Sequence, residues 1–420
     1  MKIALLCKSD STGGAAVVTF RLMNALRRKG IDARMIVAEK KSDSPWVIEA
    51  ASGNSVRFPF IAERLRIFFA SGFNRKTLFQ IDTASNGIPL HRIQFIKDAD
   101  VICLNWINQG MLSIKGLQKL TALGKPLVWT MHDMWNMTGI CHHAGYCHHF
   151  LSPGGECGNC PLLGSKASSK DISHKTWLRK QKLYSRADIH FVAVSNWLAE
   201  TARRSTLMKD ADISVIPNAF PINASSLKNR KEDSPTDSSP LKKIIFGAAR
   251  IDDPVKGHHT LVEATRILTE KYPEESKNLE LVTFGSLKDP EALKGVTIHH
   301  RHLGRISPEE IRSVYESGAV VVSTSEWETL PGTLIEGQAW GCVPVALNHG
   351  GQPDIIDHMK TGYLAPWSDD VKENALRIAE GIIWGLKNRD TVKDRMQRSV
   401  IEKFAEDSVA DQYLQLFKNL

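Results

Sequence analysis

Two successive series of short apolar segments, separated by stretches of helical periodicity, constrain the fold of this chain more than any other feature. The first series comprises KIALLC, ARMIVA, ADVICLNW, KPLVWTM, IHFVAVS and ISVIP, and the second comprises KKIIFGAA, LELVTFG, AVVVSTS and CVPVALN. Continuous apolar runs without in–out alternation are typical of strands buried on both faces of a parallel sheet. Helices between such strands serve as crossovers. The pattern predicts an α/β protein with two doubly wound, Rossmann-like domains.

The length and one polar stretch predict where these domains begin and end. A chain of 420 residues is too long for one ordinary core. The stretch KNRKEDSPTDSSP, 228–240, has the composition of a linker. We therefore expect an N-terminal domain over 1–224, a C-terminal domain over 225–402, and an amphipathic helix over 403–420 that packs back on the N-terminal domain. A ligand is expected in the cleft where the carboxyl ends of both sheets face each other.

Composition and charge narrow the environment and the partners. Hydrophobic residues make up 42% and charged residues 24% of the chain, and no apolar run approaches the ~18–20 residues that span a bilayer. The start, MKIALLCKSD, enters a strand without a leader, which predicts a cytoplasmic protein. Residues 1–220 contain 29 Lys and Arg against 16 Asp and Glu, whereas 221–420 contain 25 against 30. The basic first half suits an anionic partner, or is an ordinary solvated surface.

Candidate site residues of the first half follow predicted strands. Gly13 and Gly14 precede a helix, where glycines let backbone amides approach a phosphate or sugar, although a plain tight turn explains them equally well. His132 follows KPLVWTM and could bond a substrate hydroxyl. The alternative is a structural histidine held by the neighbouring Asp133.

In the second half, two cations and two carboxylates also follow strands. Arg250 and Lys256 come after KKIIFGAA, where a guanidinium fork and an ammonium could clamp a diphosphate. Glu328 and Glu336 stand eight residues apart in STSEWETLPGTLIEGQAWGCVPVA, the first in a loop and the second in a predicted helix. One carboxylate could then bond sugar hydroxyls and the other a ribose diol. The alternative, two solvated glutamates, is weakened by the apolar residues between them.

These motifs together resemble a known family. Glu328-x7-Glu336 with GCVPV at 341–345 and GGQPD at 350–354 is similar to the E-x7-E signature of retaining family-4 glycosyltransferases of the GT-B fold. The Gly13-Gly14 loop, His132, VSNWL at 194–198, IPN at 216–218, Arg250 and Lys256 follow in that family's order. The resemblance covers nearly the whole chain. It is strongest to bacterial members that build capsular polysaccharide, exopolysaccharide or lipopolysaccharide.

The resemblance implies roles for individual residues and for their ligands. Arg250 and Lys256 would contact the donor diphosphate, Glu336 the nucleotide ribose and Glu328 the donor sugar. The Gly13-Gly14 loop would lie under the diphosphate and acceptor, and His132 beside the transferred sugar. The donor-binding set is implied to be Gly13, Gly14, Arg250, Lys256, Gly285, Glu328, Leu330, Pro331, Gly332, Thr333 and Glu336. The donor would be a UDP- or GDP-sugar, and the acceptor a glycan or a lipid-diphosphate-linked glycan.

Two details qualify this assignment. The family has four residues between its Arg and Lys, whereas Ile251 to Val255 make five here, which we interpret as a one-residue insertion at Asp253-Pro254. Asp98-Ala99-Asp100 has the letters of a metal-binding D-x-D motif, but it precedes a strand and is interpreted as a strand-entry turn. We therefore expect no catalytic divalent metal, because Arg250 and Lys256 can stabilise the leaving diphosphate.

The stretch CHHAGYCHHFLSPGGECGNC, 141–160, is the densest group of reactive side chains. Cys141, Cys147, Cys157 and Cys160 have the spacing of a closed, structural zinc site. Reduced, metal-free thiols, disulfides and a mixed Cys/His site are the alternatives. The stretch follows His132-Asp133, so we expect it to shape the acceptor side rather than to do chemistry.

A second segment suggests membrane contact. IAERLRIFFASGFNRK, 61–76, mixes Arg64, Arg66, Arg75 and Lys76 with three phenylalanines, Phe68, Phe69 and Phe73. This mixture is compatible with a helix lying on the anionic inner face of the cytoplasmic membrane, where lipid-linked acceptors are found. A helix packed on its own domain is the alternative.

The resulting function is transfer of a sugar from a nucleotide diphosphate to a glycan or lipid-linked acceptor, with retention. A GT-B epimerase or phosphorylase is the alternative within the same fold. A zinc-containing nucleic-acid binder is a further alternative, but 141–160 contains no Lys or Arg, so no nucleic-acid partner is expected. The base, the sugar, the acceptor and the linkage are not determined by the sequence.

Overall fold

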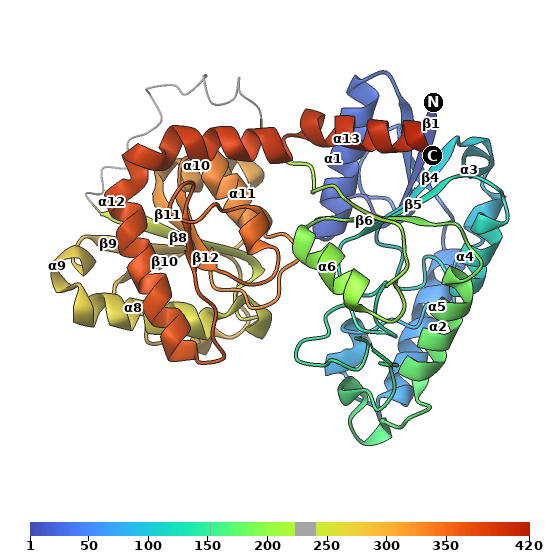
Figure 1. Cartoon of the computed structure of the whole chain (residues 1–420), viewed down its shortest axis with the longest axis horizontal. Helices are drawn as coiled ribbons and strands as arrows, with labels where there is room; N and C mark the ends of the chain where they lie inside the picture. Colours follow the sequence, from blue (N-terminus) through green and yellow to red (C-terminus); the bar gives the residue numbers. More distant parts are fainter. Residues whose placement is uncertain (152, 223–240) are drawn as a thin grey trace. The chain divides into compact units, whose positions relative to one another are not determined.

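The computed structural model describes residues 1–151, 153–222 and 241–420, which divide into two compact units (Figure 1). Unit 1 comprises Met1–Ala219 and Val409–Leu420, and unit 2 comprises Phe220–Ser408. The predicted domain boundary between residues 224 and 225 and the predicted linker, 228–240, lie outside the described residues.

Unit 1 is built on a seven-stranded parallel sheet with the strand order β3-β2-β1-β4-β5-β6-β7. Its strands are β1 (Lys2–Ser9), β2 (Asp32–Glu39), β3 (Val47–Glu49), β4 (Val101–Leu104), β5 (Leu127–Met131), β6 (His190–Ala193) and β7 (Ile213–Val215). Six of them coincide with the six predicted apolar runs. The sequence analysis missed β3, because a three-residue strand at the sheet edge carries no apolar run.

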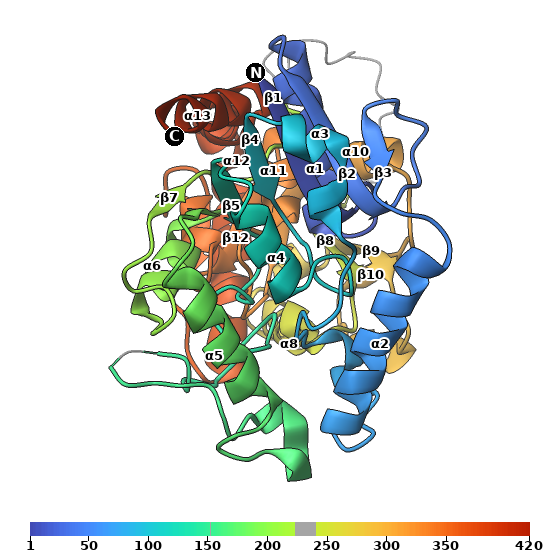
Figure 2. The same ribbon diagram turned by 90° about the vertical axis from the view of Figure 1, so that its right-hand side faces the viewer.

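Helices cover both faces of this sheet, as the two turned views show (Figure 2). They are α1 (Gly14–Arg28), α2 (Asn54–Ala70), α3 (Gln94–Asp98), α4 (Ile114–Thr121), α5 (Ile172–Tyr184) and α6 (Asn196–Arg204), with short 3-10 turns η1 (Lys76–Phe79), η2 (Leu90–Arg92) and η3 (Pro161–Lys166). The side chains of Ser113, Asp171 and Ser195 cap α4, α5 and α6 by accepting first-turn N–H groups. Leu22 and Leu26 of α1 pack in one buried cluster with the apolar residues of β1 and β2.

Unit 2 contains a six-stranded parallel sheet with the strand order β10-β9-β8-β11-β12-β13. Its strands are β8 (Lys242–Arg250), β9 (Leu279–Ser286), β10 (His299–His302), β11 (Gly318–Ser323), β12 (Val343–Leu347) and β13 (Tyr363–Ala365). The four predicted apolar runs form the four central strands. The polar β10, HHRH, and the three-residue β13 are the two edges and were missed for that reason.

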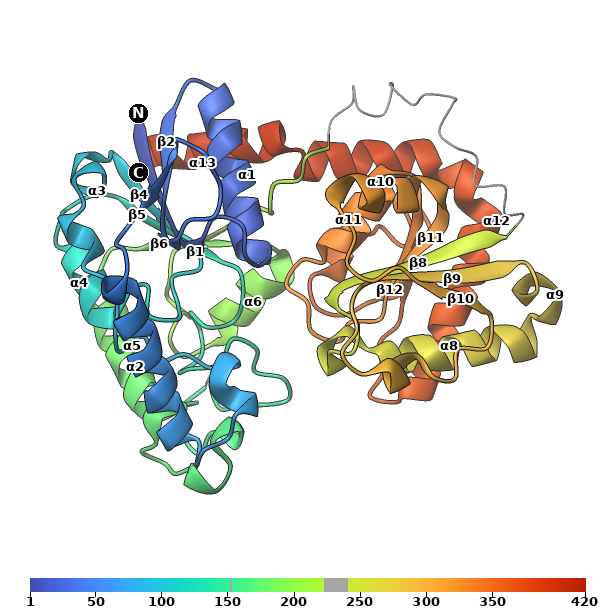
Figure 3. The same ribbon diagram turned by 180° about the vertical axis from the view of Figure 1, so that it is seen from behind.

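Figure 3 shows α8 on one side of the unit 2 sheet and α10 and α11 on the other. The helices are α8 (His258–Lys271), α9 (Pro273–Ser276), α10 (Pro308–Ser317), α11 (Gly332–Ala339) and α12 (Val371–Phe404), with 3-10 turns η4 (Pro254–Lys256), η5 (Pro290–Leu293) and η6 (Gln352–Asp354). Ser307 and Glu310 form a reciprocal capping box at the start of α10. No helix in the described part of the chain is both long and apolar enough to cross a membrane.

The last helix, α13 (Glu406–Asn419), begins three residues later than the predicted start at residue 403. Phe404 ends α12, and Ala405, with a ψ of 142°, interrupts the helical backbone. Val409, Ala410, Tyr413 and Phe417 of α13 belong to the apolar cluster of unit 1. The Tyr413 hydroxyl also shares a hydrogen bond of 2.9 Å with Thr130 Oγ1 of β5. The chain thus starts and finishes in unit 1.

Candidate active site

The predicted cations and the first predicted carboxylate lie at the carboxyl ends of two paired strands of unit 2. Arg250 is the last residue of β8, Lys256 ends the turn η4 that follows, and Glu328 lies in the loop after β11. Because β8 and β11 are parallel neighbours, the loops that follow them both leave the sheet at its carboxyl end. The structure therefore brings these three residues into one region.

The two loops are tied to each other by an ion pair and by backbone contacts. Lys256 Nζ donates to Glu328 Oε1, and both side chains are largely shielded from solvent. Thr324 Oγ1 donates to the Lys256 carbonyl at 3.0 Å, and the Glu326 N–H donates to the Val255 carbonyl at 3.2 Å. The five residues between Arg250 and Lys256 form a turn that Asp253 caps, so the longer spacing still brings Lys256 to Glu328.

Arg250 is held more loosely than Lys256. Its nearest carboxylates are Asp252 at 3.8 Å from Nε and Asp253 at 3.6 Å from Nη2, distances too long for charge-assisted hydrogen bonds. The Nε atom is itself buried and has no hydrogen-bond partner among the described residues. A buried donor without a partner is uncommon in a folded protein. An anion that approaches the carboxyl end of this sheet can therefore accept a hydrogen bond from Arg250.

Glycines allow the surrounding loops to approach one another closely. Gly257 has a φ of +66°, and a Cβ at this position would lie 2.0 Å from the Thr324 carbonyl oxygen. Gly350 has a φ of +62°, and its Cβ would lie 2.6 Å from the Glu328 carbonyl oxygen, which accepts the Gly351 N–H at 2.8 Å. Both positions exclude any side chain, so the Glu328 loop is packed between two glycine turns.

The remaining predicted donor-binding residues of unit 2 lie at the start of α11 and at the end of β9. Leu330 and Pro331 are buried, Gly332 and Thr333 are half-buried, and the half-buried Glu336 lies in the second turn of α11. Gly285 was expected in a loop, but it is the penultimate residue of β9. Its φ of +129° and the Ala248 carbonyl, 1.7 Å from an added Cβ, require glycine.

In unit 1, Gly13 and Gly14 form the open N-terminus of α1. Gly13 has a φ of +91°, and an added Cβ on either glycine would meet no atom within 4 Å. In the described part of the chain no side-chain cap of this helix is found, and its first turn contains no acidic residue. The first-turn N–H groups and the positive end of the helix dipole suit an anion. The role of this loop under a diphosphate stays a prediction.

His132 follows the last residue of β5, as predicted. Its Nε2 lies 3.0 Å from Asn105 Oδ1, and burial lowers its pKa to about 4, although the neighbouring Asp133 opposes this shift. The imidazole is therefore neutral near pH 7, and it can take part in hydrogen bonds without bringing a charge to the site. The structural alternative, a histidine held by Asp133, stays open beside the functional one.

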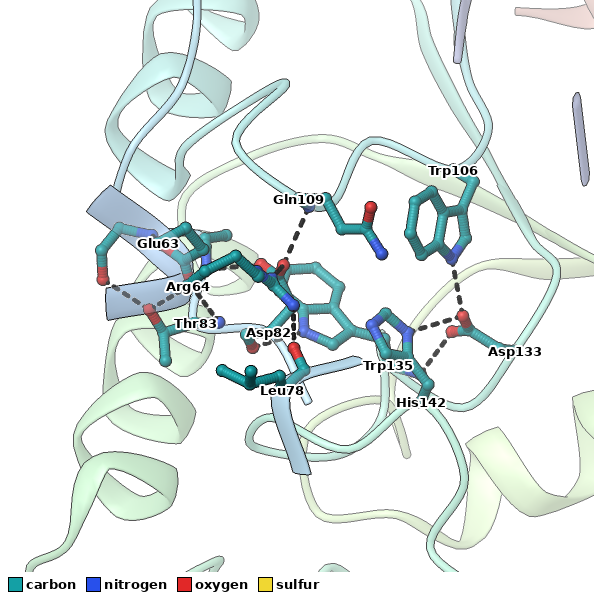
Figure 4. A network of polar contacts seen from close by, with 12 residues as sticks. Glu63, Arg64, Leu78, Asp82, Thr83, Trp106, Gln109, Asp133, Trp135 and His142 are labelled. Carbon is teal, nitrogen blue, oxygen red and sulfur yellow. Dashed lines mark hydrogen bonds and ion pairs between the residues drawn. The ribbon is translucent and has the colours of Figure 1, made fainter. Parts of the chain in front are cut away.

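Asp133 instead bonds three groups of the same unit (Figure 4). Asp133 Oδ2 accepts from Trp106 Nε1 at 2.9 Å and from His142 Nδ1 at 2.8 Å, while Oδ1 accepts the Trp135 N–H at 2.8 Å. Burial alone would raise the pKa of Asp133, but the charge and hydrogen bond of His142 outweigh it, and the pKa lies well below its usual value. His142 is thus a buried partner of the segment His132-Asp133-Met134-Trp135, termed the HDMW segment.

The polar network continues from Trp135 to helix α2 (Figure 4). Trp135 Nε1 donates to the Asp82 carbonyl at 2.8 Å, and Asp82 Oδ2 accepts from Arg64 Nη2 at 2.6 Å and from the Gln109 N–H at 2.8 Å. Glu63 accepts the N–H and the hydroxyl of Thr83 at 2.7 and 2.6 Å. Arg64 Nη1 also donates to the Leu78 carbonyl.

This network was not predicted, because its members come from residues 63 to 142 and share no motif. The only local signals are two acids, Glu63 and Asp82, in a stretch that is otherwise apolar and basic. Both are fully buried, and burial together with the Asp82 charge raises the pKa of Glu63. Ala84 and Gln109, whose N–H groups both bond Asp82, have φ values of 44° and 55°. Left-handed backbone at non-glycine residues persists only where such surroundings hold it.

The four cysteines of the 141–160 segment lie in one neighbourhood. The hydrogen bond from Cys141 to Cys160 raises the pKa of the first thiol and lowers that of the second, and the Gly139 N–H bonds Cys157 Sγ at 3.1 Å. Cys147 is half-buried. Within residues 1–151, 153–222 and 241–420, however, no group of three or more His, Cys, Asp or Glu side chains is arranged to hold a metal ion. The structural zinc site stays a prediction.

Asp98 and Asp100 occupy the turn that was predicted for them. Asp98 ends α3, Asp100 directly precedes β4, and Asp100 Oδ2 accepts the Lys2 N–H at 2.7 Å. The interpretation of this pair as a strand-entry turn is confirmed.

Two family models match consecutive parts of the chain. One described as Glycosyltransferase Family 4 matches residues 12–223, about half of the chain, and one described as Glycosyl transferases group 1 matches residues 229–403.

Curated relatives match over part of their length. Spore coat protein SA of Bacillus subtilis is 27% identical over 191 residues, which are 42% of this chain and 49% of that protein. A D-inositol 3-phosphate glycosyltransferase of Corynebacterium efficiens is 26% identical over 238 residues, which are 50% and 54% of the two chains. The chain therefore matches about half the length of these relatives.

Solved structures match over the whole chain. HepE of Anabaena, in complex with UDP and glucose, aligns over 100% of both chains with a TM-score of 0.58 and 17% identity. A glycosyltransferase of Rickettsia africae aligns over 100% of this chain and 98% of its own, with a TM-score of 0.61 and 17% identity. These matches confirm the predicted GT-B fold class with two Rossmann-like domains. With the family match over residues 12–223, they show that the chain belongs to Glycosyltransferase Family 4.

Proposed function

We propose that this chain is a hexosyltransferase that moves a sugar from a nucleoside diphosphate donor to a glycan or lipid-diphosphate-linked acceptor, with retention of anomeric configuration. The observation that carries the proposal is the cluster of Arg250, Lys256 and Glu328 at the carboxyl ends of β8 and β11. The complexes of HepE with UDP-glucose support a nucleotide-sugar donor, and the uridine base is the first to test.

Glycosyl transfer requires that the negative charge developing on the leaving diphosphate be stabilised. When the bond between the anomeric carbon and the diphosphate oxygen breaks, the electron pair leaves with the diphosphate and the acceptor oxygen bonds the carbon. Preorganised cations that face the diphosphate lower this barrier. Arg250, whose Nε lacks a partner among the described residues, would supply a guanidinium fork.

Lys256 and Glu328 would work as a pair. In the structure they neutralise each other, so donor binding would draw the Lys256 ammonium toward the diphosphate while Glu328 accepts hydroxyls of the sugar. Glu336, half-buried in α11, would take the ribose diol. In unit 1, the neutral His132 would bond a hydroxyl of the transferred sugar, and the α1 N-terminus at Gly13 and Gly14 would stabilise the diphosphate.

The pathway we propose is bacterial surface-polysaccharide synthesis, in the cytoplasm and with the acceptor at the inner face of the membrane. This part rests on the resemblance to the bacterial members that build surface polysaccharides and on the basic excess of residues 1–220. A basic surface suits a diphosphate-linked acceptor.

Thermal stabilisation by a panel of UDP- and GDP-sugars tests the donor site. We expect one sugar nucleotide to raise the Tm by several degrees, and Glu336→Ala to weaken that binding by about tenfold or more through loss of the ribose contact. Glu291→Ala, on the exposed turn η5 of the same unit, is the comparison variant and should bind like the unaltered chain. Equal binding by Glu336→Ala would refute the ribose assignment.

Product analysis then separates transfer from the related reactions. A transferase releases free nucleoside diphosphate only when an acceptor is added. Release without an acceptor, or phosphate-dependent formation of a sugar phosphate, would favour the epimerase or phosphorylase alternative instead.

A further inference from the structure

Helix α2 turns an apolar stripe toward solvent and buries two charged residues beside Pro59 and Ile67. Its buried residues include the charged pair Glu63 and Arg64. Its exposed side chains include Phe58, Ile61, Leu65 and Phe69. These four residues follow one another at intervals of three and four, so they line one stripe along the helix. A surface helix normally turns such a stripe toward the core.

The polar network fixes this orientation. Glu63 is bonded by Thr83 and by the Ser85 N–H at 3.0 Å, and Arg64 by Asp82 and Leu78 (Figure 4). Rolling the helix to hide its apolar stripe would break all of these buried bonds. Arg64 therefore does not belong to the outward-facing cations of the 61–76 segment, which corrects the sequence analysis. The exposure of the stripe is therefore fixed by the buried hydrogen bonds of the helix.

The apolar surface continues beyond the helix. Together with Phe73 and Phe79, the four stripe residues form what we term the α2 face, and each of the six is between 49% and 72% exposed. The rings of Phe68, Phe69 and Phe73 contact one another edge to face, with centroids 5.2–6.1 Å apart. The α2 face holds six of the thirteen exposed large apolar side chains of the described residues, so it is a concentrated patch.

The charges around the α2 face have one sign. Arg57, Arg66, Arg75 and Lys76 are all exposed. The only acids between residues 50 and 97 are Glu63 and Asp82, and both are fully buried. On the helix, Arg57 and Arg66 flank the apolar stripe on opposite sides. Figure 2 shows α2 along the lower right edge of unit 1.

We propose that the α2 face docks on the surface of an anionic lipid bilayer. A helix with an exposed aromatic stripe flanked by cations lies in the interface with its rings among the acyl chains and its cations at the headgroups. The stripe from Phe58 to Phe69 is about 17 Å long, enough for a helix lying parallel to the surface. A second copy of the chain is a poorer partner, because two such faces would bring like charges together.

Vesicle sedimentation tests this proposal without donor or acceptor, so its result is independent of glycosyl transfer. The unaltered chain should sediment with phosphatidylcholine vesicles that contain about 30% phosphatidylglycerol at about 0.05 M salt. Phe58→Ser/Phe69→Ser should lower the partition coefficient by about tenfold or more. Arg66→Gln/Arg75→Gln should lower it by about tenfold on anionic vesicles only.

Met359→Ser/Val371→Ser removes two exposed apolar side chains of unit 2 and should leave the partition coefficient unchanged. All substituted residues are exposed, and Ile61→Ser/Leu65→Ser repeats the test if the first double variant unfolds. Failure of the unaltered chain to bind, or equal binding by the phenylalanine variants, would overturn the proposal. So would self-association in solution that the phenylalanine variants abolish, since that result identifies a second copy as the partner.

Discussion

The buried network of unit 1 and the loop cluster of unit 2 use the same kinds of side chain in opposite ways. In unit 1, Asp133 accepts three hydrogen bonds between 2.8 and 2.9 Å, and Asp82 and Glu63 are bonded similarly. In unit 2, Arg250 lies 3.6–3.8 Å from its nearest carboxylates. The Arg250 Nε, His349 Nε2 and Gln352 Oε1 atoms are buried there without hydrogen-bond partners among the described residues. Arg64 Nε in the network also lacks a partner there, but both terminal nitrogens of Arg64 are bonded.

The difference distinguishes side chains that stabilise the fold from side chains that can still bond a ligand. A buried carboxylate whose oxygens are all bonded gives stability and fixes its neighbours, but it has no bond left for a ligand. A cation with weak partners loses little when a ligand replaces them. The unit 1 network therefore holds the HDMW segment and α2 in place, whereas the unit 2 loops leave Arg250 available for the diphosphate contact that we propose.

The largest effect is expected from Arg250→Ala. Removing the loosely held guanidinium should lower kcat/KM by about 10³-fold, the size found for loss of one preorganised donor to a developing anion. The free energy of unfolding should change by less than about 1 kcal/mol, because only exposed, long ion pairs are lost. Steady-state kinetics and denaturant unfolding measure the two quantities.

Arg266→Ala, on the exposed side of α8 and paired with Glu263 and Glu270, provides the comparison. Its kcat/KM should match that of the unaltered chain. If Arg250→Ala lowered the free energy of unfolding by several kcal/mol, Arg250 would be a residue that stabilises the fold. The unit 1 network and the unit 2 loop cluster would then not differ in this respect.

Asp82→Ala is expected to act mainly on stability. The variant leaves the buried Arg64 guanidinium and the Gln109 N–H without their carboxylate, and breaking such a pair lowers the free energy of unfolding by about 4 kcal/mol. Urea unfolding followed by circular dichroism measures this loss. The exposed Asp188→Ala should change stability by less than about 0.5 kcal/mol. A loss below about 1 kcal/mol in Asp82→Ala would show that the network is not a support.

The predicted zinc site would stabilise the region around the HDMW segment further. If Cys141, Cys147, Cys157 and Cys160 bind zinc, protein purified without chelator contains one equivalent, and its removal lowers the free energy of unfolding by about 3 kcal/mol, as for opening a loop cross-link of this length. Metal analysis and thiol titration decide the matter. Under about half an equivalent of zinc with four freely titratable thiols would refute the site.

A smaller, pH-dependent effect is expected at His132. Its folded-state pKa of about 4 lies below the unfolded value of roughly 6.5, so the unfolded chain binds the proton first as the pH falls. Between pH 7 and pH 5 the unaltered chain should therefore lose about 2 kcal/mol more stability than His132→Asn. Urea unfolding at both pH values measures the difference. Parallel losses in the two proteins would mean that the histidine is solvated.

The sequence predicted the parts of this molecule that depend on local pattern. Apolar runs located the nine central strands and the edge strand β7, and the glycines and the E-x7-E spacing located the unit 2 loops. The other three edge strands, β3, β10 and β13, were missed because an edge strand needs no apolar run. The Lys256–Glu328 pair depends on the conformations of two loops, which the sequence does not give. The need for glycine at 257 and 350 becomes clear only when the carbonyl groups that approach these two residues are known.

The unit 1 network could not be predicted for a different reason. Its bonds join Glu63, Asp82, Asp133 and His142 across 80 residues, and no periodicity links such positions. Helix α2 is an exception to the usual relation between periodicity and burial. Its periodicity predicts that the apolar stripe faces the core, but the stripe is exposed. Only the burial of Glu63 and Arg64 shows which side faces inward.

The membership of α13 in unit 1 has a consequence for biosynthesis. Val409, Ala410, Tyr413 and Phe417 complete an apolar cluster whose other buried residues all come from the first 219 positions, and the ribosome makes them after unit 2. During translation, unit 2 emerges and can fold while the older unit still exposes the patch that α13 will cover. The nascent first unit is therefore the aggregation-prone intermediate of this chain. Its release from chaperones should coincide with synthesis of α13 rather than with completion of residue 219.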